Sequence, residues 1–325
     1  MAEAHGEAVP LQKPRIGISA CLLGRAVRYN GGHCRDRFLT DTLGRFVEWV
    51  PVCPEVECGL PTPRESMHLE GELSSPRLVT TRTHVDHTDR MQRWASKRIK
   101  ELEQGDLCGF IFKTNSPSSG IRAIRVYDRN GFPRKVGVGV FAKPFMEHFP
   151  LLPVEDEGRL HDAGIRENFI ERVFALKRYR AFLASGGSLG GLVEFHARHK
   201  MQLMAHSQRH LSEMGKLVAQ AADGFPGQVR ERYEELLLKA LGLKATEKKN
   251  ANVLLHMLGF LKARLSPDEK QEMLEVIGQY KAALVPLIVP ITLLQHYVRK
   301  YDELYLKRQS YLNPHPMELK LRNHS

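Results

Sequence analysis

Short apolar runs, bounded by turn-forming residues, mark the first half of the chain. Runs of this length, rich in Ile, Val and Phe, are typical of buried strands. One run contains Pro51, which cannot donate a ladder hydrogen bond, so we expect that strand at a sheet edge. The predicted strands are residues 15–20 (RIGISA), 48–53 (EWVPVC), 108–113 (CGFIFK) and 121–128 (IRAIRVYD).

Between these runs, apolar residues recur at the spacing of amphipathic helices. This period predicts helices at residues 36–47, 88–103 and about 140–148. Because strands and helices alternate, we predict an α/β N-terminal domain with a mainly parallel sheet.

From about residue 166 the helical period takes over, and no strand signal follows residue 190. Ser266, Pro267 and Glu269 mark the start of a helix: Ser266 is the cap, Pro267 lies in the first turn, and Glu269 follows three residues after the cap. We therefore expect an all-α C-terminal domain with helices at 192–206, 207–222, 228–241, 246–264, 267–282 and 286–307. The predicted organisation is a flexible tail at 1–13, an α/β domain at 14–160, a helical linker with a glycine-rich hinge at 161–190, and the helical domain at 191–325.

Composition narrows the functional classes. Lys and Arg outnumber Asp and Glu by 48 to 37, a formal charge of +11, which favours a polyanionic partner such as RNA. No run of about twenty apolar residues occurs, so we expect no membrane partner. The first residues lack the apolar centre of a signal peptide, so we expect a cytoplasmic protein. The sequence indicates no protein partner.

The five cysteines lie in the first third of the chain, and in a cytoplasmic protein we expect them to be reduced. Cys108 opens a strand and is expected to be a buried hydrophobic residue far from Cys21. Cys21 and Cys53 instead follow strand ends. The carboxyl ends of parallel strands are where ligands bind, and the loop at 116–120 leaves a strand at the same edge. We expect a functional site there.

The residues alone leave the chemistry of this site open. A zinc site lacks CxxC pairs with histidine spacing and a fourth ligand. A catalytic Cys–His pair needs a base, and the pattern does not place His33 or His68 near Cys21. An iron–sulfur cluster with thiolates from separate loops is the third alternative.

Several motifs resemble known families. The stretches ISACLLG, VRYNGG, PVCPEVECGLPTPRE and FKTNSPSSG resemble the TudS-type thiouracil desulfidases. The stretches EFHARHKMQLMAHS, ANVLLHMLGFLK and YLNPHPMELKLRNH resemble the YbgA-like domain of unknown function. In this order, the two resemble the RudS-type enzymes, which remove sulfur from 4-thiouridine in tRNA.

The resemblance implies a 4Fe-4S cluster that is held by three cysteines and has one open iron. Ser119 stands where the small desulfidases have the third cysteine. We therefore expect Cys21, Cys53 and Cys58 as ligands, with Cys34 in reserve. The resemblance also implies catalytic roles for Glu55, Ser116 and Ser118 and substrate contacts for Arg28, Asn30, Lys113 and Ser119.

In the helical half, cationic side chains would face water in any case, and the resemblance makes them candidates for tRNA contacts. His196, His199 and His206 lie near one helix face, but their apolar neighbours favour a place at the edge of the core over a metal site. The candidate tRNA-binding residues are Arg198, Lys200, Lys248, Lys249, Lys262, Arg299 and Lys300.

The leading hypothesis is thus a tRNA 4-thiouridine desulfidase that hydrolyses C=S to C=O without net redox. One alternative is desulfidation of free thiouracil or thiouridine. Another is a non-catalytic RNA-binding protein whose cluster is structural or sensing. A metal-free enzyme with a cysteine nucleophile is the last.

Overall fold

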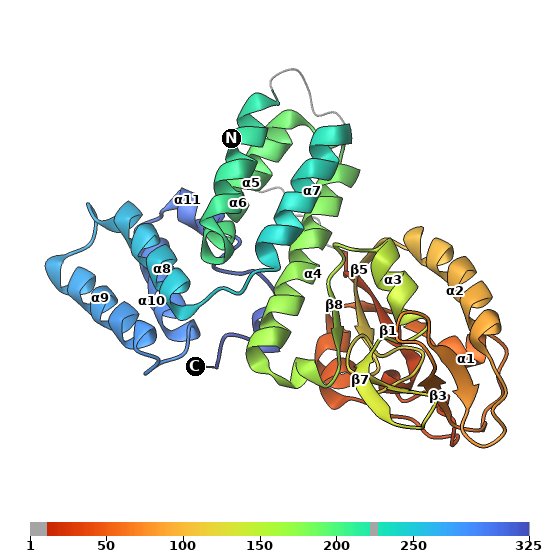
Figure 1. The fold of residues 1–325 in the computed structure, drawn as a ribbon. Helices are drawn as coiled ribbons and strands as arrows, with labels where there is room; N and C mark the ends of the chain where they lie inside the picture. The colour runs from red at the N-terminus through yellow and green to blue at the C-terminus, as the bar shows by residue number, and fades with distance from the viewer. Residues whose placement is uncertain (1–11, 222–226, 325) are drawn as a thin grey trace.

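The computed structural model describes residues 12–221 and 227–324, and it has two parts (Figure 1). An α/β half comes first and a region of many helices follows, so the predicted fold class is confirmed. The expected N-terminal tail lies almost wholly outside the described residues.

The main sheet of the α/β half is parallel throughout, with the strand order β2-β1-β5-β8. The central strands β1 and β5 are buried nearly along their whole length, which explains why they are continuous apolar runs. Pro51 lies on the edge strand β2, as predicted. The strands are β1 (Arg15–Ser19), β2 (Glu48–Val52), β5 (Leu107–Phe112) and β8 (Val154–Asp156).

Glycines in the central strands allow close packing on this sheet. A Cβ atom at Gly17 would lie 2.1 Å from the ring of Phe110. At Gly109 it would lie 2.9 Å from Val173 of helix α4 (Ala163–Ala184). The sheet therefore accepts an aromatic ring at one point and a helix at the other.

A second sheet, which the sequence did not reveal, has the strand order β4-β3-β6-β7 and mixes parallel and antiparallel pairs. The strand predicted at 121–128 is present as β6 but belongs here, paired with β3 and β7. Its alternate residues Ile124 and Val126 are buried, whereas Arg125 is exposed. The strands are β3 (Met67–Glu70), β4 (Arg77–Thr80), β6 (Ile124–Tyr127) and β7 (Pro133–Gly137).

Helices of the α/β half largely follow the predicted periods. Helix α2 (Thr88–Glu103) has the predicted bounds, and α3 (Ala142–His148) lies within its predicted range. The helix expected at 36–47 is instead a π-helical turn over Phe38–Thr42 and a 3-10 turn over Leu43–Arg45. The other short elements are the 3-10 turns Ala20–Leu23, Arg159–His161 and Met317–Leu319 and the one-turn helix α1 (Pro54–Glu57).

The helical half agrees closely with the sequence period, and the described residues after 190 contain no strand. Ser266 and Glu269 form the expected capping box at the start of α9. The helices are α5 (Leu189–His206), α6 (Gln208–Gln220), α7 (Gly227–Leu241), α8 (Glu247–Leu261), α9 (Pro267–Lys281), α10 (Ile288–Lys300) and α11 (Leu304–Lys307).

Helix α4 lies between the two halves and contributes to both cores (Figure 1). Phe169 and Val173 pack in the core of the α/β half. Tyr179 packs with α5 and α7 residues such as Phe195 and Tyr233. A helix buried on opposite faces has no single polar stripe, so its charged residues are spread around it and some of them, such as Glu171 and Lys177, are buried.

Among the described residues, no helix is long and apolar enough to cross a membrane.

Candidate active site

A cavity of about 370 Å³ opens at the carboxyl edge of the main sheet. The loops after β1, β2 and β5 all contribute to its lining, which agrees with the expected position of the site. Three thiols line it, from Cys21, Cys34 and Cys53.

The loop after β1 brings Cys34 back to Cys21. Gly24 has a φ of 89°, a left-handed conformation that favours glycine, and it turns the chain directly after Cys21. The carbonyl of Cys21 accepts hydrogen bonds from the backbone N–H of Gly24 (3.2 Å) and of Cys34 (2.9 Å). The guanidinium of Arg28 donates to Cys34 Sγ at 2.9 Å. This loop therefore fixes Cys34 beside Cys21.

Cys53 and Cys58 stand at opposite ends of the helix α1, as its N-cap and C-cap. The Cys53 thiol lies 3.5 Å from Glu55 Oε2 and faces the cavity. The Cys58 thiol donates to the Glu55 carbonyl at 3.2 Å and packs against the apolar core of the second sheet. The described lining residues of the cavity do not include Cys58. Cys58, the expected third ligand, thus lies outside the described lining, whereas the reserve candidate Cys34 lines the cavity together with Cys21 and Cys53.

Glu55 is held between two of the loops. Its Oε1 accepts a hydrogen bond of 2.5 Å from Ser118 Oγ. Its Oε2 lies 3.8 Å from the buried guanidinium of Arg64, which also donates to the Val27 carbonyl at 3.0 Å. These contacts fix the carboxylate at the cavity wall, where a water and a substrate can reach it.

The loop after β5 is ordered by its own hydroxyl groups. Ser116 and Ser118 share a hydrogen bond of 3.0 Å, and Ser116 Oγ accepts one of 3.1 Å from the Ser119 N–H. Gly139 packs against the outside of the loop so closely that a Cβ atom there would lie 2.3 Å from the Ser118 carbonyl. Ser116 and Ser119 line the cavity, whereas Ser118 reaches it through Glu55.

The structure divides the predicted substrate-binding residues. Arg28, Lys113 and Ser119 line the cavity. Lys113 forms an ion pair with Glu157, and its backbone N–H donates to Ser19 Oγ at 2.9 Å. Asn30 does not belong to the described lining; its Oδ1 accepts from the Gly32 N–H at 3.1 Å and so stabilises a turn.

Other lining residues escaped the sequence reasoning, among them Tyr29, Met67, Thr114 and Asn115. Arg64 also lines the cavity and pairs with Glu55. Tyr29, Thr114 and Asn115 each stand next to a predicted residue in the sequence, whereas Met67 and Arg64 carry no such signal.

Burial controls the charge of the thiols. It raises the pKa of Cys21 to about 11 and that of Cys53 to about 12, with Glu55 adding to both. Both thiols are therefore neutral at physiological pH unless a cation binds them. In addition, neither His33 nor His68 is among the described lining residues. A cysteine nucleophile activated by a histidine has no support here.

The donor set fits an iron–sulfur cluster. The thiols of Cys21 and Cys34, from the loop after β1, and of Cys53, from the loop after β2, line one cavity, and thiolates are the ligands of such clusters. No group of three His, Cys, Asp or Glu side chains in residues 12–221 and 227–324 is arranged to hold a metal ion. A polynuclear cluster spaces its ligands more widely than one ion does, and metal binding deprotonates buried thiols.

The predicted cations of the helical half differ in their surroundings. Arg198 pairs with Glu194, Lys300 pairs with Glu269, and Lys249 donates to the His206 carbonyl. Lys200, Lys248, Lys262 and Arg299 are exposed and have no ion pair in the described chain. The expectation that the three histidines take part in packing agrees with their contacts: His196 bonds Tyr233, His199 bonds Arg178 and Phe195, and His206 pairs with Glu171.

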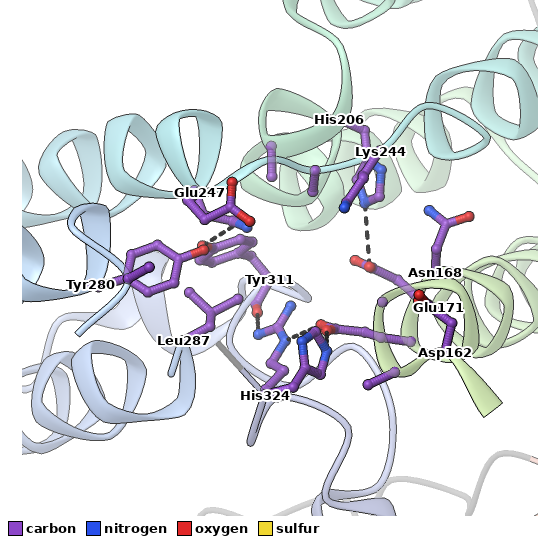
Figure 2. Close-up of a pocket in the computed structure, with 18 of the residues that line it drawn as sticks. Asp162, Asn168, Glu171, His206, Lys244, Glu247, Tyr280, Leu287, Tyr311 and His324 are labelled. Atoms are coloured by element: carbon purple, nitrogen blue, oxygen red, sulfur yellow. Dashed lines mark hydrogen bonds and ion pairs between the residues drawn. The ribbon is translucent and has the colours of Figure 1, made fainter. Parts of the chain in front are cut away.

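A second cavity, of about 270 Å³, lies among α4, α8 and the C-terminal segment (Figure 2). Figure 2 shows Glu171 and His206 directed toward one another across it, with 3.3 Å between Oε2 and Nε2. Glu167 accepts from Arg322 and His324. Its charged side chains are thus largely paired with one another, and its described lining contains no thiol.

Comparisons with known proteins divide the chain in the same way. A family described as 2-thiouracil desulfurase matches residues 16–157, and a family described as protein of unknown function (DUF1722) matches residues 200–316. The uncharacterized protein YbgA of Escherichia coli (strain K12) is 29% identical over 157 residues, 47% of this chain and 90% of its own length.

Two further proteins are similar to part of the chain. The uncharacterized protein YbbK of Bacillus subtilis (strain 168) is 30% identical over 110 residues, 32% of this chain and 72% of its own length. The solved structure of a [4Fe-4S]-dependent thiouracil desulfidase, TudS, is 31% identical, with a TM-score of 0.39, and the match covers 46% of this chain and 95% of that one.

Proposed function

Because the chain belongs to the 2-thiouracil desulfurase family through residues 16–157 and to the DUF1722 family through residues 200–316, we propose that it is an iron–sulfur-dependent desulfidase acting on 4-thiouridine in tRNA. One observation carries this proposal: the thiols of Cys21, Cys34 and Cys53 meet the carboxylate of Glu55 at one cavity. Sulfur ligands and a proton-transfer group are the two components that such a reaction needs.

The proposed reaction hydrolyses the C4 thiocarbonyl. Water adds its oxygen to C4, the C–S bond breaks, and sulfur leaves as hydrogen sulfide, so no electrons are transferred. Glu55 accepts a proton from the water and returns one to the ring or the leaving sulfur. Arg64 and Ser118 hold the orientation of this carboxylate.

Cys21, Cys34 and Cys53 would hold the cluster. When bound by three thiolates, it supplies an iron with a free position, a soft Lewis acid that polarises a C=S bond. Ser116, Ser119 and the backbone of their loop would orient the base, and Arg28 and Lys113, which line the same cavity, would contact the ribose.

We propose that the helical half binds the rest of the tRNA. Its exposed cations Lys200, Lys248, Lys262 and Arg299 have no ion pair in the described chain, so each is available for a phosphate. A stacked base must be exposed to enter the cavity, which implies local unstacking of the tRNA.

The test is to incubate anaerobically reconstituted protein with thiolated tRNA. We expect loss of the 4-thiouridine absorbance with release of one sulfide per base. An unchanged spectrum, in a preparation with full iron and sulfide content, contradicts the proposal.

The family description favours a second candidate, desulfidation of free 2-thiouracil or a thiolated nucleoside. Ionic strength distinguishes the two, because phosphate contacts make tRNA turnover fall steeply with salt and a neutral base has no such contacts. Rapid turnover of the base at a rate independent of salt, without turnover of tRNA, supports this candidate. Binding of tRNA with no sulfide release from either substrate supports a structural or sensing cluster.

A further inference from the structure

A shallow groove of about 550 Å³ adjoins the thiol-lined cavity. Met67, Asn115 and Pro117 line both, so the groove continues from the cavity without a break. Its floor is the second sheet, which the desulfidation chemistry does not use.

The pairing register of this sheet separates its two faces. Leu69 pairs with Val126, and both belong to the apolar core below. The alternate residues Arg125 and Tyr127 on β6 therefore lie on the opposite face. His68 of β3 lies there too, with its ring 5.1 Å from that of Tyr127 in an edge-to-face contact.

Two cations on this face stand opposite one another. Arg125 pairs with Lys135 in the antiparallel register of β6 and β7, and both side chains are exposed and line the groove. Like charges directly across a strand pair destabilise a sheet. Neither residue has an ion pair within the described part of the chain, whereas the nearby carboxylate Glu70 already pairs with Arg77 at 2.7 Å. The repulsion is therefore uncompensated and an anion would relieve it.

We propose that this groove, defined by His68, Arg125, Tyr127 and Lys135, binds the single-stranded RNA segment that flanks the nucleotide in the cavity. Arg125 and Lys135 contact phosphates, and the ring of Tyr127, held by its edge-to-face contact with His68, is the platform on which the neighbouring base stacks. The inference rests on the proposed function for the identity of the nucleotide in the cavity. It assigns the α/β half its own share of RNA binding, separate from the helical half.

An RNA strand fits better than an acidic peptide. Its charges repeat along a backbone beside unstacked bases, and the groove offers paired cations next to aromatic rings. The strand would also have to continue into the cavity, where a single base is admitted.

The variants are Arg125→Ala with Lys135→Ala, compared with Arg134→Ala as the matched control. Arg134 is exposed on the same strand but pairs with Val126, on the other face. Tyr127→Ala and Tyr127→Phe test the platform. The holoenzyme is used throughout, with iron and sulfide content measured for each variant.

We expect the double variant to weaken tRNA binding about 10- to 100-fold and to lower the slope of log Kd against log salt concentration by roughly one to two. Tyr127→Ala should weaken it about ten-fold, with most of the loss restored in Tyr127→Phe, because stacking needs the ring and not the hydroxyl. Arg134→Ala should remain near wild type. Turnover of the free nucleoside should be the same in all of them.

Binding and turnover separate this inference from the proposed function. If tRNA affinity and its salt slope are unchanged in the double variant, the groove does not bind RNA, whatever the activity. If the affinity falls as expected but the wild-type holoenzyme releases no sulfide, the groove stands and the proposed desulfidation fails. An equal loss of nucleoside turnover in the double variant indicates a damaged site and also overturns the inference.

Discussion

At the scale of single residues, the carboxylate of Glu55 is the group on which the proposed reaction depends. It is held by Ser118 and Arg64 and lies 3.5 Å from the thiol of Cys53. Among the side-chain hydrogen bonds of the described residues, the one between Cys53 and Glu55 joins a cavity thiol to a carboxylate. This place between the sulfur donors and the serine loop is the reason why we propose Glu55 as the proton-transfer group.

Replacing Glu55 with Gln should lower kcat for desulfidation by about 10²- to 10⁴-fold, because the amide cannot accept the proton yet can still accept the hydrogen bond from Ser118. Iron content should be unchanged. The control is Glu57→Gln on the same helix, whose carboxylate only accepts from the Cys53 N–H at 2.8 Å and pairs with Arg98. Wild-type kcat in Glu55→Gln would remove this residue from the mechanism.

The cysteines give a second prediction at this scale. Cys34→Ser should lower the iron and sulfide bound per chain, because its thiol lines the cavity beside Cys21. Cys58→Ser should retain both, because its thiol faces the apolar core of the second sheet. Anaerobic iron and sulfide assays measure the difference. The reverse result, with loss only in Cys58→Ser, would restore Cys58 as the third ligand.

At the scale of elements, the loop after β5 keeps its shape because Gly139 presses against it without a side chain. In Gly139→Ala the added methyl group would overlap the backbone at Ser118, so loop or strand must move. We expect a loss of about 1–3 kcal/mol of stability and a fall in kcat, since Ser118 holds Glu55. Thermal unfolding and turnover measure the two effects.

Gly278→Ala is the matched control for that substitution. Gly278 lies within α9 with no atom near its added Cβ, so alanine there should leave kcat unchanged and raise stability by about 0.5–1 kcal/mol. If Gly139→Ala behaves in the same way as Gly278→Ala, the loop does not depend on that close contact.

Elements with a strong period were predictable, and those shaped by non-local pairing were not. Helix α2 and the helices from α5 to α10 follow the 3.6-residue period closely. The short strands β3, β4 and β7 carry no such signal: β7 is almost wholly exposed, so no apolar alternation marks it. The sheet that holds them is joined by the pair β3–β6, whose strands lie far apart in the chain, and the sequence period does not report such a contact.

The residues of the candidate site were likewise predictable only in part. Cys21, Cys53 and the serine loop were found because each directly follows a strand of a parallel sheet. Cys58, expected as a third ligand from its place in the same loop, lies outside the described lining, because loop membership does not determine the direction of a side chain and one turn of helix separates it from Cys53. Cys34 reaches the cavity through hydrogen bonds to the Cys21 carbonyl, which the sequence does not encode as a pattern.

At the scale of the whole molecule, the buried pair Glu171 and His206 links α4 to the end of α5 (Figure 2). Burial alone would raise the pKa of Glu171, but the contacts with His206 and Arg322 outweigh it and lower that pKa to about 2. Burial opposes the charged form of His206, yet Glu171 raises the pKa of this imidazole above 6.5. Each group thus keeps the other charged.

This pair predicts how stability depends on pH. The lowered pKa of Glu171 contributes stability that is complete above about pH 4.5 and is lost as pH falls toward 2. The raised pKa of His206 contributes stability that is complete below about pH 6.5 and is lost as pH rises through the folded-state value. The difference in Tm between the wild type and Glu171→Gln should therefore be largest between about pH 4.5 and 6.5.

Thermal unfolding across pH measures this difference, and Glu213→Gln serves as the control. Glu213 is an exposed carboxylate paired with Arg209 within one helix, so its loss should shift Tm little at any pH. A Tm difference for Glu171→Gln that does not vary between about pH 5 and 9 would show that the imidazole does not hold its charge in the folded protein.

Helix α4 couples the stability of the two halves. The match to the desulfurase family ends at residue 157. The core of this half is completed by apolar residues of α4, including Phe169 and Val173. Dividing the chain after residue 157 would leave exposed apolar surface on both fragments. A self-sufficient first fragment has to extend to about the Gly186–Gly187 turn, and the remainder would then lack the ring of Tyr179 at its own centre. Unfolding of one half should therefore also unfold the other, so that the protein unfolds in a single cooperative transition although two families match it.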